Sequence, residues 1–586
     1  WRDFSKQNTW TANAYVNYTK TFAKKHNLNV MAGVNAEEEE YKYLYGTRNV
    51  MYDQEGYPEL NMAGKDGQDL SWNHTSRASA GYFGRINYDY KGIYLLELNG
   101  RYDGSSRFPH TDQWAFFPSA SIGYRFSEEA YFAPLKHIVS NGKLRASFGE
   151  IGNEAVGDYM FEQLISQRLN NKSTGYIYWI ENNNANANLL TMYNMPDLVS
   201  STLTWERIRT LNIGLDLGLL NDELTIGFDW FQRENRDMLA PAQVLPNTLG
   251  ASAPYENAGT LRTRGWELNL NWRHTFGDFD VYANFNIGDS KTKVTKWDND
   301  SKLLSTYYTG KTYGDIFGFE TDRYFEEKDF TSQNADGSWN YANGIASQAG
   351  LESGNFHYGP GDVKFKDLDG NGKIDGGKGT ADDHGDLKVI GNSMPRYEYS
   401  FHLGGAWKGI DLDLYFQGVG KREDWTTSSL NLPAMVHADV AIYSHQTSYN
   451  KVLWNSDYTA ITGYEVNQGN RYPRLYRGTN NSGGTVSGIA NGCNNYYPQS
   501  RYLTDMSYLR LKNVTVGYTL PKEWTRKAYI EKARIYFSGS NLFLLHKGND
   551  LPVDPEISTG NGLTAGGWGR IAPITRTFSF GVQVTL

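Results

Sequence analysis

One segment of the sequence has the residue types and spacing of a metal-binding loop, Asp367-Leu-Asp369-Gly-Asn371-Gly-Lys373-Ile-Asp375. Oxygen ligands stand at positions 1, 3, 5 and 9, position 7 would offer a backbone carbonyl, and Gly occupies position 6, as in an EF-hand calcium loop. Position 12, where a bidentate Glu completes such a loop, is Lys378, and Asp382, Asp383 or Asp386 could supply the missing charge. The alternative is a solvated turn, because tight turns select the same residues. The predicted ligands of a structural Ca²⁺ are Asp367, Asp369, Asn371, Lys373 and Asp375.

Two stretches rich in aromatic side chains have the composition of a sugar-binding surface. Aromatic rings stack on the C–H faces of sugars, and amide or carboxylate groups pair with their hydroxyls. The first stretch is followed by an Asn-rich run from Asn182 to Asn188. Each ring alone could equally pack its own loop or a partner protein, so the prediction concerns the group. The predicted substrate-binding residues are Tyr176, Tyr178, Trp179, Tyr443, Tyr449, Trp454, Tyr458, Tyr464, Tyr472 and Tyr476.

Motifs that carry catalysis are incomplete in this chain. The segment from Gly372 to Gly379 resembles a phosphate loop, but Gly379 occupies the position where Ser or Thr holds Mg²⁺. Neither Gly-x-Ser-x-Gly nor His-Glu-x-x-His is present, and the single cysteine, Cys493, has no His nearby in the sequence. Asp411 and Asp413 lie on the polar side of an alternating segment, where a polar pore wall explains them. We therefore expect no enzymatic activity and no required cofactor.

Composition excludes several classes of protein. The chain has 586 residues, 61 of them Gly, with 15% aromatic residues, one Cys and a net charge of −8. A single Cys excludes a disulfide framework, and the acidic balance argues against a protein that binds nucleic acid. No apolar stretch approaches the ~20 residues of a membrane-spanning helix. A transmembrane β-barrel remains, because its strands alternate lipid-facing and lumen-facing residues and so have a moderate mean hydropathy.

Strict alternation of apolar and polar residues over ten or more positions dominates the chain. Residues Phe279, Val281, Ala283, Phe285 and Ile287 alternate with Asp, Tyr and Asn residues, a pattern typical of a strand with one apolar and one polar face. About fifteen such segments are present. They begin near Trp10, Leu28, Ala78, Ile93, Ser119, Lys143, Arg207, Leu224, Gly265, Phe279, Tyr397, Asp411, Leu509, Arg534 and Thr577.

The connections between these segments are alternately short and long. The longest run over residues 291–395, which contain the calcium-like motif, and over residues 422–500, which are rich in aromatics. Short periplasmic turns that alternate with long extracellular loops are typical of an outer-membrane barrel. Trp230, Trp272 and Tyr90 lie near strand ends, as girdle residues do. The alternative, a stack of soluble β-sandwiches, predicts shorter strands.

Strand parity yields a further expectation. If the C-terminus lies in the periplasm, the last strand runs toward the periplasm. Because the fifteen predicted strands alternate in direction, the first strand, near Trp10, also runs toward the periplasm. Because a single-chain bacterial barrel has an even number of strands and starts from the periplasm, we expect an odd number of strands before Trp1. About seven more would give the 22 strands of a plugged transporter. Residues 1–586 are then a partial barrel, whose plug domain and first strands are outside this chain.

Several short segments carry a family resemblance when they are taken in chain order. They include Leu144-Arg-Ala-Ser-Phe-Gly149, Trp205-Glu206, Asp229-Trp-Phe-Gln-Arg233, Arg264-Gly-Trp-Glu267, Tyr508-Leu-Arg-Leu-Lys-Asn513, Gly539-Ser-Asn-Leu542 and Arg576-Thr-Phe-Ser-Phe-Gly581. The chain resembles the SusC/RagA group of TonB-dependent outer-membrane transporters. The segments extend from Leu144 to Leu586, whereas the first ~140 residues match in pattern more than in motif.

This resemblance implies a barrel in the bacterial outer membrane, closed by an N-terminal plug, energised by TonB–ExbB–ExbD and capped by a SusD-like lipoprotein. It implies import of oligosaccharides or oligopeptides. A TonB box and plug are not found in this sequence, and its last residue is Leu586 where an aromatic is usual. The loop aromatics favour an oligosaccharide. Alternatives are an oligopeptide, a receptor for metal chelates or cobalamin, and a barrel enzyme or surface structural protein.

Overall fold

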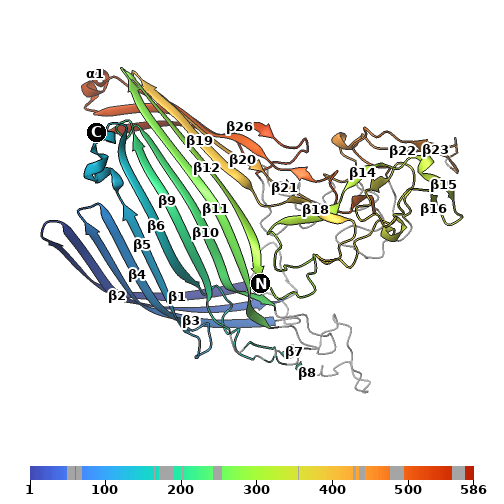
Figure 1. Ribbon diagram of the computed structural model, residues 1–586, viewed down its shortest axis with the longest axis horizontal. Helices are drawn as coiled ribbons and strands as arrows, with labels where there is room; N and C mark the ends of the chain where they lie inside the picture. The colour runs from blue at the N-terminus through green and yellow to red at the C-terminus, as the bar shows by residue number, and fades with distance from the viewer. Residues whose placement is uncertain are drawn as a thin grey trace.

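A computed structural model describes most of the chain. The described residues are 1–48, 60, 69–163, 165, 167–169, 191–193, 196, 198–200, 203–241, 254–353, 356–425, 430–433, 442–457, 459–475, 494–556 and 574–586. Within them, one antiparallel sheet of fifteen strands follows the order of the chain, with β1 and β27 at its edges (Figure 1). The sheet curls into a curved wall.

The fifteen strands of the wall match the fifteen predicted segments. Each predicted start lies inside or next to one strand, so the strand count is confirmed. The strands are β1 (Arg2–Phe22), β2 (His26–Thr47), β3 (Asp69–Tyr90), β4 (Tyr94–Ser105), β5 (Trp114–Tyr124), β6 (Val139–Asn153), β9 (Glu206–Leu219), β10 (Leu224–Pro241), β11 (Tyr255–Phe276), β12 (Phe279–Lys296), β19 (Arg396–Trp407), β20 (Ile410–Lys421), β25 (Tyr508–Thr519), β26 (Lys532–Lys547) and β27 (Thr577–Thr585).

The two ends of the wall differ as the sequence predicted. Five turns of two to four residues join strands at one end, and the longest connections, 297–395 and 422–507, leave from the other. Lys408 and Gly409 form one of these turns with φ of 48° and 89°, the left-handed pair of a type I′ hairpin turn. β1 and β27 both run toward the turn end, where the C-terminus lies (Figure 1). The expectation of further strands before Trp1 stays a prediction.

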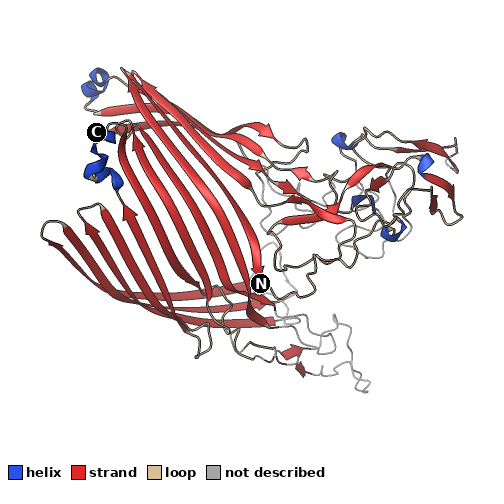
Figure 2. Cartoon of the chain, in the orientation of Figure 1, coloured by secondary structure: helices blue, strands red, loops and turns tan. Residues whose placement is uncertain are grey.

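Smaller elements lie outside the wall. Figure 2 shows that helices are confined to the turn end and to the long loops. They are η2 (Phe126–Glu128), η3 (Ala130–Leu135), η6 (Glu327–Asp329), η7 (Ala349–Leu351), η8 (Ser444–Gln446), η9 (Asn494–Tyr496), α1 (Lys522–Thr525) and η10 (Arg526–Ala528). The loop strands are β7 (Gln167–Leu169), β8 (Thr191–Tyr193), β13 (Asp315–Phe319), β14 (Thr321–Tyr324), β15 (Phe330–Gln333), β16 (Trp339–Tyr341), β17 (Val363–Phe365), β18 (Leu387–Asn392), β21 (Glu423–Asp424), β22 (Lys451–Trp454), β23 (Ile461–Glu465) and β24 (Thr504–Asp505). Among the described residues, no helix is long and apolar enough to span a membrane.

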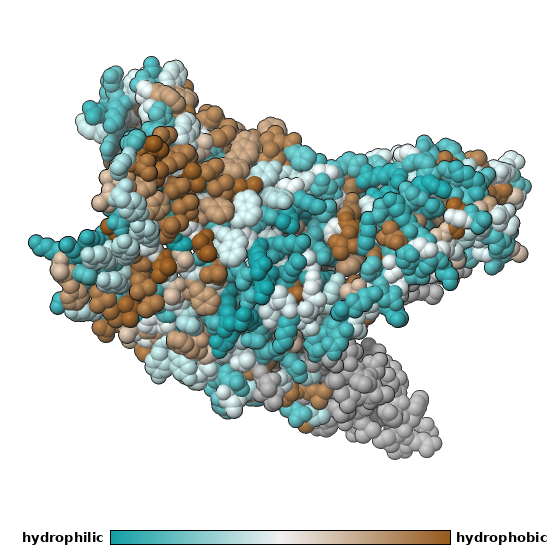
Figure 3. Space-filling model, viewed as in Figure 1, coloured by the Kyte–Doolittle hydropathy of each residue, from teal (hydrophilic) through white to brown (hydrophobic). Residues whose placement is uncertain are grey.

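Register places the apolar alternates of neighbouring strands on one face of the wall. Leu144, Leu215, Phe228, Leu268 and Ile287 lie side by side on five successive strands. The same face carries exposed apolar side chains along the other strands, and it forms an apolar surface over the half of the wall nearer the turns (Figure 3). Because nothing in the described chain covers this surface, burial in lipid rather than against a second sheet accounts for it.

Aromatic rings border the apolar surface at two levels. Near the turns, the ring centroids of Tyr90 and Tyr94 are 6.4 Å apart and those of Tyr94 and Tyr124 are 5.2 Å apart. Toward the loops, Trp114 stacks on Tyr82 and Tyr102. Eight residues separate Tyr82 from Tyr90, about 27 Å along a strand and roughly 20 Å across a bilayer at the usual tilt. This spacing is close to the ~25 Å apolar band of outer-membrane barrels.

Several strands are longer than the sequence predicted. β2, β3 and β11 each have 22 residues, twice the ~9–11 that cross a bilayer. β12 continues through Lys296, so the following loop begins at residue 297 rather than 291. The second long loop ends at residue 507 rather than 500, where β25 starts. The wall therefore extends beyond the membrane on the side of the long loops.

Candidate functional site

The inner face of the wall is polar along its length. Asn29, Asn87, Glu97, Ser121, Ser147 and Asn212 lie next to one another on six successive strands. Each of them alternates with a residue of the apolar face, so the same pattern that creates the lipid-facing surface creates this one. Side chains with amides and hydroxyls hydrate readily and pair with polar solutes. The inner face can therefore line an aqueous path.

Charged groups on the inner face are paired with each other across strands. Arg145 donates from Nη1 to Asp229 (2.6 Å) and from Nε to Asp216 (3.0 Å). Arg534 donates from Nε to Asp411 at 2.9 Å. These pairs join β6, β9 and β10 in one place and β20 and β26 in another. They leave the wall polar but with much of its local charge neutralised.

Asp413 belongs to a smaller cluster on the same face. Its carboxylate accepts hydrogen bonds from Tyr282 Oη and from His402 Nε2, the latter at 2.6 Å. The three residues come from β12, β19 and β20. The prediction that Asp411 and Asp413 point to the lumen side is confirmed by the register, because their neighbours Leu412 and Leu414 lie on the apolar face.

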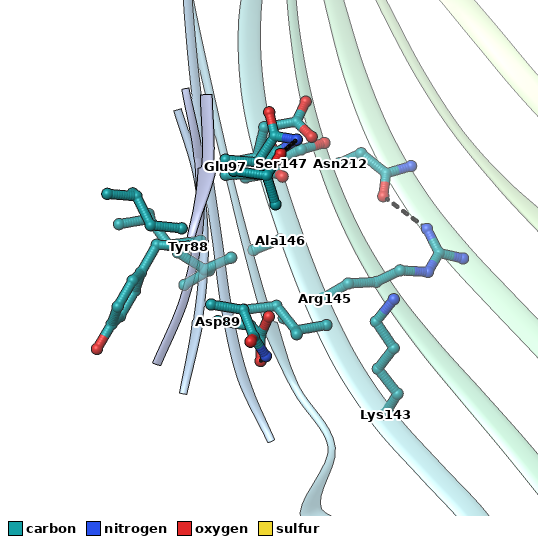
Figure 4. A pocket seen from close by; sticks show the side chains of 18 residues that line it. Tyr88, Asp89, Glu97, Lys143, Arg145, Ala146, Ser147 and Asn212 are labelled. Atoms are coloured by element: carbon teal, nitrogen blue, oxygen red, sulfur yellow. Dashed lines mark hydrogen bonds between the residues drawn. The ribbon is translucent and has the colours of Figure 1, made fainter. Parts of the chain in front are cut away.

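A groove of about 510 Å³ lies against β1–β6 and β9 (Figure 4). Glu97, Ser147 and Asn212 contribute polar side chains to it. Arg145 reaches across to Asn212, to which it donates a hydrogen bond of 3.4 Å. Tyr88 points away from the inner residues in this view. The groove is wide enough for a small polar solute, and no reactive constellation lines it.

The two longest loops fold together, which the sequence analysis missed. We call their described residues within 297–395 and 422–507 the loop module; it projects beyond the strand ends (Figure 1). Its main core draws on both loops. The buried residues are Phe319, Tyr324, Val363, Phe365, Ile374, Leu432, Tyr472, Tyr496 and Tyr502. Apolar and aromatic residues such as Tyr324 and Phe325 within a supposed loop are the signal that could have predicted a packed unit.

Asp362 joins the two loops at the centre of the module. Its side chain is fully buried, and Arg474 donates to both carboxylate oxygens, from Nε at 2.9 Å and from Nη2 at 2.7 Å. Asn495 Nδ2 donates to Asp362 Oδ1 at 2.8 Å, and the Gly359 amide donates to Oδ2. A buried carboxylate with four donors holds segments from both loops in one arrangement.

The predicted sugar-binding residues fall into three groups. Tyr176, Tyr178, Trp179, Tyr458 and Tyr476 lie outside the described residues. Tyr472 is fully buried and stacks on Tyr502, so this prediction is wrong for Tyr472: the ring packs the module core. Tyr449 lies against the same core, and Tyr464 contacts Trp339. Tyr443 (41% exposed) and Trp454 (46% exposed) offer rings to solvent, and for these two the prediction stands untested.

The calcium-like motif brings three carboxylates together. Oxygens of Asp367, Asp369 and Asp386 lie within 4.8 Å of one another, and Asp386 is fully buried. Asp386 is therefore the residue that could replace the missing Glu, whereas Asp382 pairs with Lys302. Asp375, a predicted ligand, is outside this group and caps the Gly377 amide. An all-oxygen donor set fits Ca²⁺, but the same carboxylates also accept backbone N–H groups, as they would in an ion-free turn.

The calcium site stays a prediction and is directly measurable. We expect the double variant Asp367→Asn/Asp369→Asn of the full-length protein to weaken Ca²⁺ binding at least about tenfold, because it removes two charged ligands. Asp382→Asn, outside the cluster, is the control. Metal analysis after dialysis against graded Ca²⁺ concentrations reads out the affinity, and equal affinity in both variants would assign the motif to a plain turn.

Asp424 makes the base of the loop module sensitive to pH. Its side chain is buried on β21, and burial raises the pKa of the carboxyl to about 6, although Arg422 lies 3.7 Å away. The folded pKa exceeds the unfolded value of ~3.9, so the folded module takes up a proton more readily. The stabilisation is full below pH ~4 and is lost as pH rises through 6, a change of about 3 kcal/mol. Proteolysis of the loops should therefore be slower at pH 5 than at pH 8.

Two matched variants test whether Asp424 causes the pH dependence of the loop module. Asp424→Asn removes the titrating group and should abolish most of the difference between pH 5 and pH 8. Asp457→Asn, on an exposed turn, should retain it. If the wild type and Asp424→Asn showed the same pH dependence of proteolysis, another group would control the module.

Comparisons with known proteins agree with this architecture. Residues 1–382 match the family model described as TonB dependent receptor-like, beta-barrel. TonB-dependent receptor P3 of Formosa agariphila is 27% identical and the match covers 98% of this chain and 52% of the relative. TonB-dependent receptor SusC of Bacteroides thetaiotaomicron is 25% identical, with coverage of 94% and 48%. The chain spans about half the length of the curated relatives it matches.

A solved structure shares the fold. The RagAB peptide transporter superposes with a TM-score of 0.70 at 19% identity, over 99% of this chain and 55% of the solved chain. The resemblance to SusC and RagA inferred from the short motifs is thus confirmed, as is the all-β, antiparallel transmembrane architecture. With its apolar outer face, polar inner face and loop asymmetry, the chain belongs to the TonB-dependent receptor-like β-barrel family of the bacterial outer membrane.

Proposed function

We propose that this protein imports an oligosaccharide across the outer membrane, energised through TonB–ExbB–ExbD and assisted by a SusD-like surface lipoprotein. One observation carries the proposal: an ordered module made of the two longest loops stands at the extracellular end of a wall whose inner face is polar. A packed module of this kind provides a fixed surface for a large ligand or a lid protein. The proposal includes no enzymatic step.

The character of the inner wall supports a neutral polymer as cargo. Arg145 is paired with Asp229 and Arg534 is paired with Asp411, so amides and hydroxyls remain to contact a solute. These groups suit the hydroxyls of a sugar. Tyr443 and Trp454 on the module add exposed rings that can stack on sugar faces.

An oligopeptide is the second candidate, favoured by the fold shared with the RagAB peptide transporter. A peptide has charged termini and a backbone that pairs with amides, so the Asn-rich face would also accept it. A receptor for metal chelates or cobalamin is a third candidate, and it would work without a lid lipoprotein.

Purification of the full-length protein from its native outer membrane in mild detergent separates these candidates. Mass spectrometry of the associated proteins and small oligomers should find a lipoprotein and an oligosaccharide. A bound peptide would replace the glycan assignment by the peptide one. A barrel that copurifies with no lipoprotein would overturn the proposal in favour of a chelate receptor.

Variants of the exposed rings test the contact with cargo. Tyr443→Ala/Trp454→Ala should weaken oligosaccharide binding at least about tenfold, since each stacked ring contributes on the order of 1 kcal/mol. Tyr529→Ala is the matched control, because Tyr529 is 93% exposed at the opposite, turn end of the wall. Unchanged affinity in the double variant would place the cargo elsewhere.

A further inference from the structure

A band of basic side chains lies on the outward face of the wall, on the side of the loops. We call it the cationic belt. Register places its members in the rows that directly follow the row of Trp230 and Trp266 on β9, β10, β11 and β12. Its members are Arg207, Arg209, Arg236, Arg262, Arg264, Lys291 and Lys293. They share a face with Phe228 and Leu268, so they lie on the lipid side of the wall and not in the lumen.

Two buried carboxylates hold four of these arginines in place. Glu150 pairs with Arg209 and, at 3.2 Å, with Arg207; its side chain is 6% exposed. Glu234, 9% exposed, pairs with Arg236 and Arg262, each at 2.7 Å. The four arginine side chains are themselves 33–40% exposed. The acids are thus covered, and guanidinium groups with donors to spare form the surface.

The remaining three cations add unbalanced charge. Arg264, Lys291 and Lys293 are exposed, and within the described part of the chain none of them has an ion-pair partner. Arg264 donates from Nε to Gln232, a neutral partner, at 2.8 Å. Seven cations against two carboxylates leave the belt strongly positive. The feature is local, because β2 presents Glu38 and Glu40 on the same outward face.

The level of the belt matches that of lipid headgroups. Arg264 is two residues beyond Trp266, about 7 Å along the strand, and Trp residues occupy the membrane interface. In Figure 3 the apolar surface over the turn half of the wall gives way to hydrophilic surface toward the loops. The long loops mark the extracellular side, so the belt faces the headgroups of the outer leaflet.

We propose that the cationic belt binds the phosphate groups of an outer-leaflet glycolipid of the lipid A type. Phosphate is recognised best by Arg guanidinium groups, which donate pairs of hydrogen bonds in a fixed fork. Acyl chains of the same lipid would lie on the adjoining apolar rows, next to Phe228 and Leu268. This continuity of apolar and cationic surface on one face fits a lipid, which carries both parts, and not a soluble anion.

The decisive variant neutralises the belt without disturbing its buried acids. Arg264→Gln/Lys291→Gln/Lys293→Gln leaves the pairs of Glu150 and Glu234 intact. The full-length protein is purified from outer membrane, and native mass spectrometry counts the phosphorylated lipid bound to each barrel. We expect the bound lipid to fall at least about fivefold, the effect of a single cation near a membrane surface. Heat-modifiable migration on gels confirms that the variant is folded.

Two control variants distinguish positive charge in the cationic belt from positive charge elsewhere on the protein. Lys328→Gln/Lys378→Gln/Lys451→Gln removes three exposed loop cations and should leave the bound lipid unchanged. Arg264→Lys/Lys291→Arg/Lys293→Arg keeps the charge and should retain the lipid. If the neutral triple variant failed to fold, Arg264→Gln alone would be measured in the same way.

Reconstitution identifies the source of the phosphate. Vesicles containing phosphorylated lipid A should raise the unfolding temperature of the wild type, and those containing dephosphorylated lipid A should not. Equal lipid in wild type and triple variant would overturn the proposal. So would equal stabilisation by the dephosphorylated lipid, or displacement of the bound lipid by excess inorganic phosphate.

Discussion

Replacement of Leu414 by Lys is expected to destabilise the folded barrel by about 2–4 kcal/mol. Leu414 lies midway along β20, and its register neighbours are Leu403 on β19 and Val514 on β25, all on the apolar face. A Lys there would bring an ammonium group into the lipid away from both interfaces, where neither water nor a carboxylate solvates it. Urea unfolding of the full-length protein in lipid vesicles measures the loss.

Asp413→Asn is the matched control, one residue away on the opposite face. The Asn oxygen still accepts one of the hydrogen bonds that Tyr282 and His402 donate to Asp413, and the site stays on the polar side. We expect a loss below about 1.5 kcal/mol, the range of one hydrogen bond. Equal losses for Leu414→Lys and Asp413→Asn would show that the assignment of faces to β20 is wrong.

Replacement of Arg474 by Met is expected to open the loop module, at a cost of about 3–5 kcal/mol. The substitution keeps much of the side-chain volume but leaves the fully buried carboxylate of Asp362 without its cation. Asn495 and Gly359 still donate to that carboxylate, but two neutral donors do not compensate a buried charge. Hydrogen exchange of the module amides in the full-length protein reads out the opening free energy.

Two further variants test whether the effect of Arg474→Met is specific to the buried pair of Asp362 and Arg474. Lys451→Met breaks an exposed pair with Glu465 at 3.4 Å and should cost less than about 1 kcal/mol. Asp362→Asn/Arg474→Met removes both charges and should recover part of the loss, since no uncompensated charge remains. If Arg474→Met left exchange in both loops unchanged, the pair would not be what joins them.

Local patterns in the sequence determined the wall. Alternation from Phe279 to Ile287 specifies a strand with two unlike faces, because successive side chains of a strand point in opposite directions whatever lies around it. The same rule assigned Asp411 and Asp413 to the polar side of their strand, and the lengths of the connections oriented the barrel. Short motifs such as Arg264-Gly-Trp-Glu267 then identified the family.

Contacts between segments far apart in the sequence decided the features that the sequence did not predict. Asp362 and Arg474 are 112 positions apart, and neither residue alone indicates that two loops share a core. Likewise, only the chain path selects Asp386 over Asp382 as the third carboxylate of the calcium-like motif, and only side-chain burial moves Tyr472 from a sugar surface to a core.

The cationic belt also depends on strand pairing that the sequence does not reveal. Four strands each contribute Arg or Lys residues that are not distinctive in the sequence, and these cations form a band because hydrogen-bonded register aligns β9, β10, β11 and β12. The alternation of apolar and polar residues is a property of each strand by itself, so it can be recognised from the sequence. Which strands and loops meet depends on pairing and packing between distant segments, and that is what the tertiary structure alone decided.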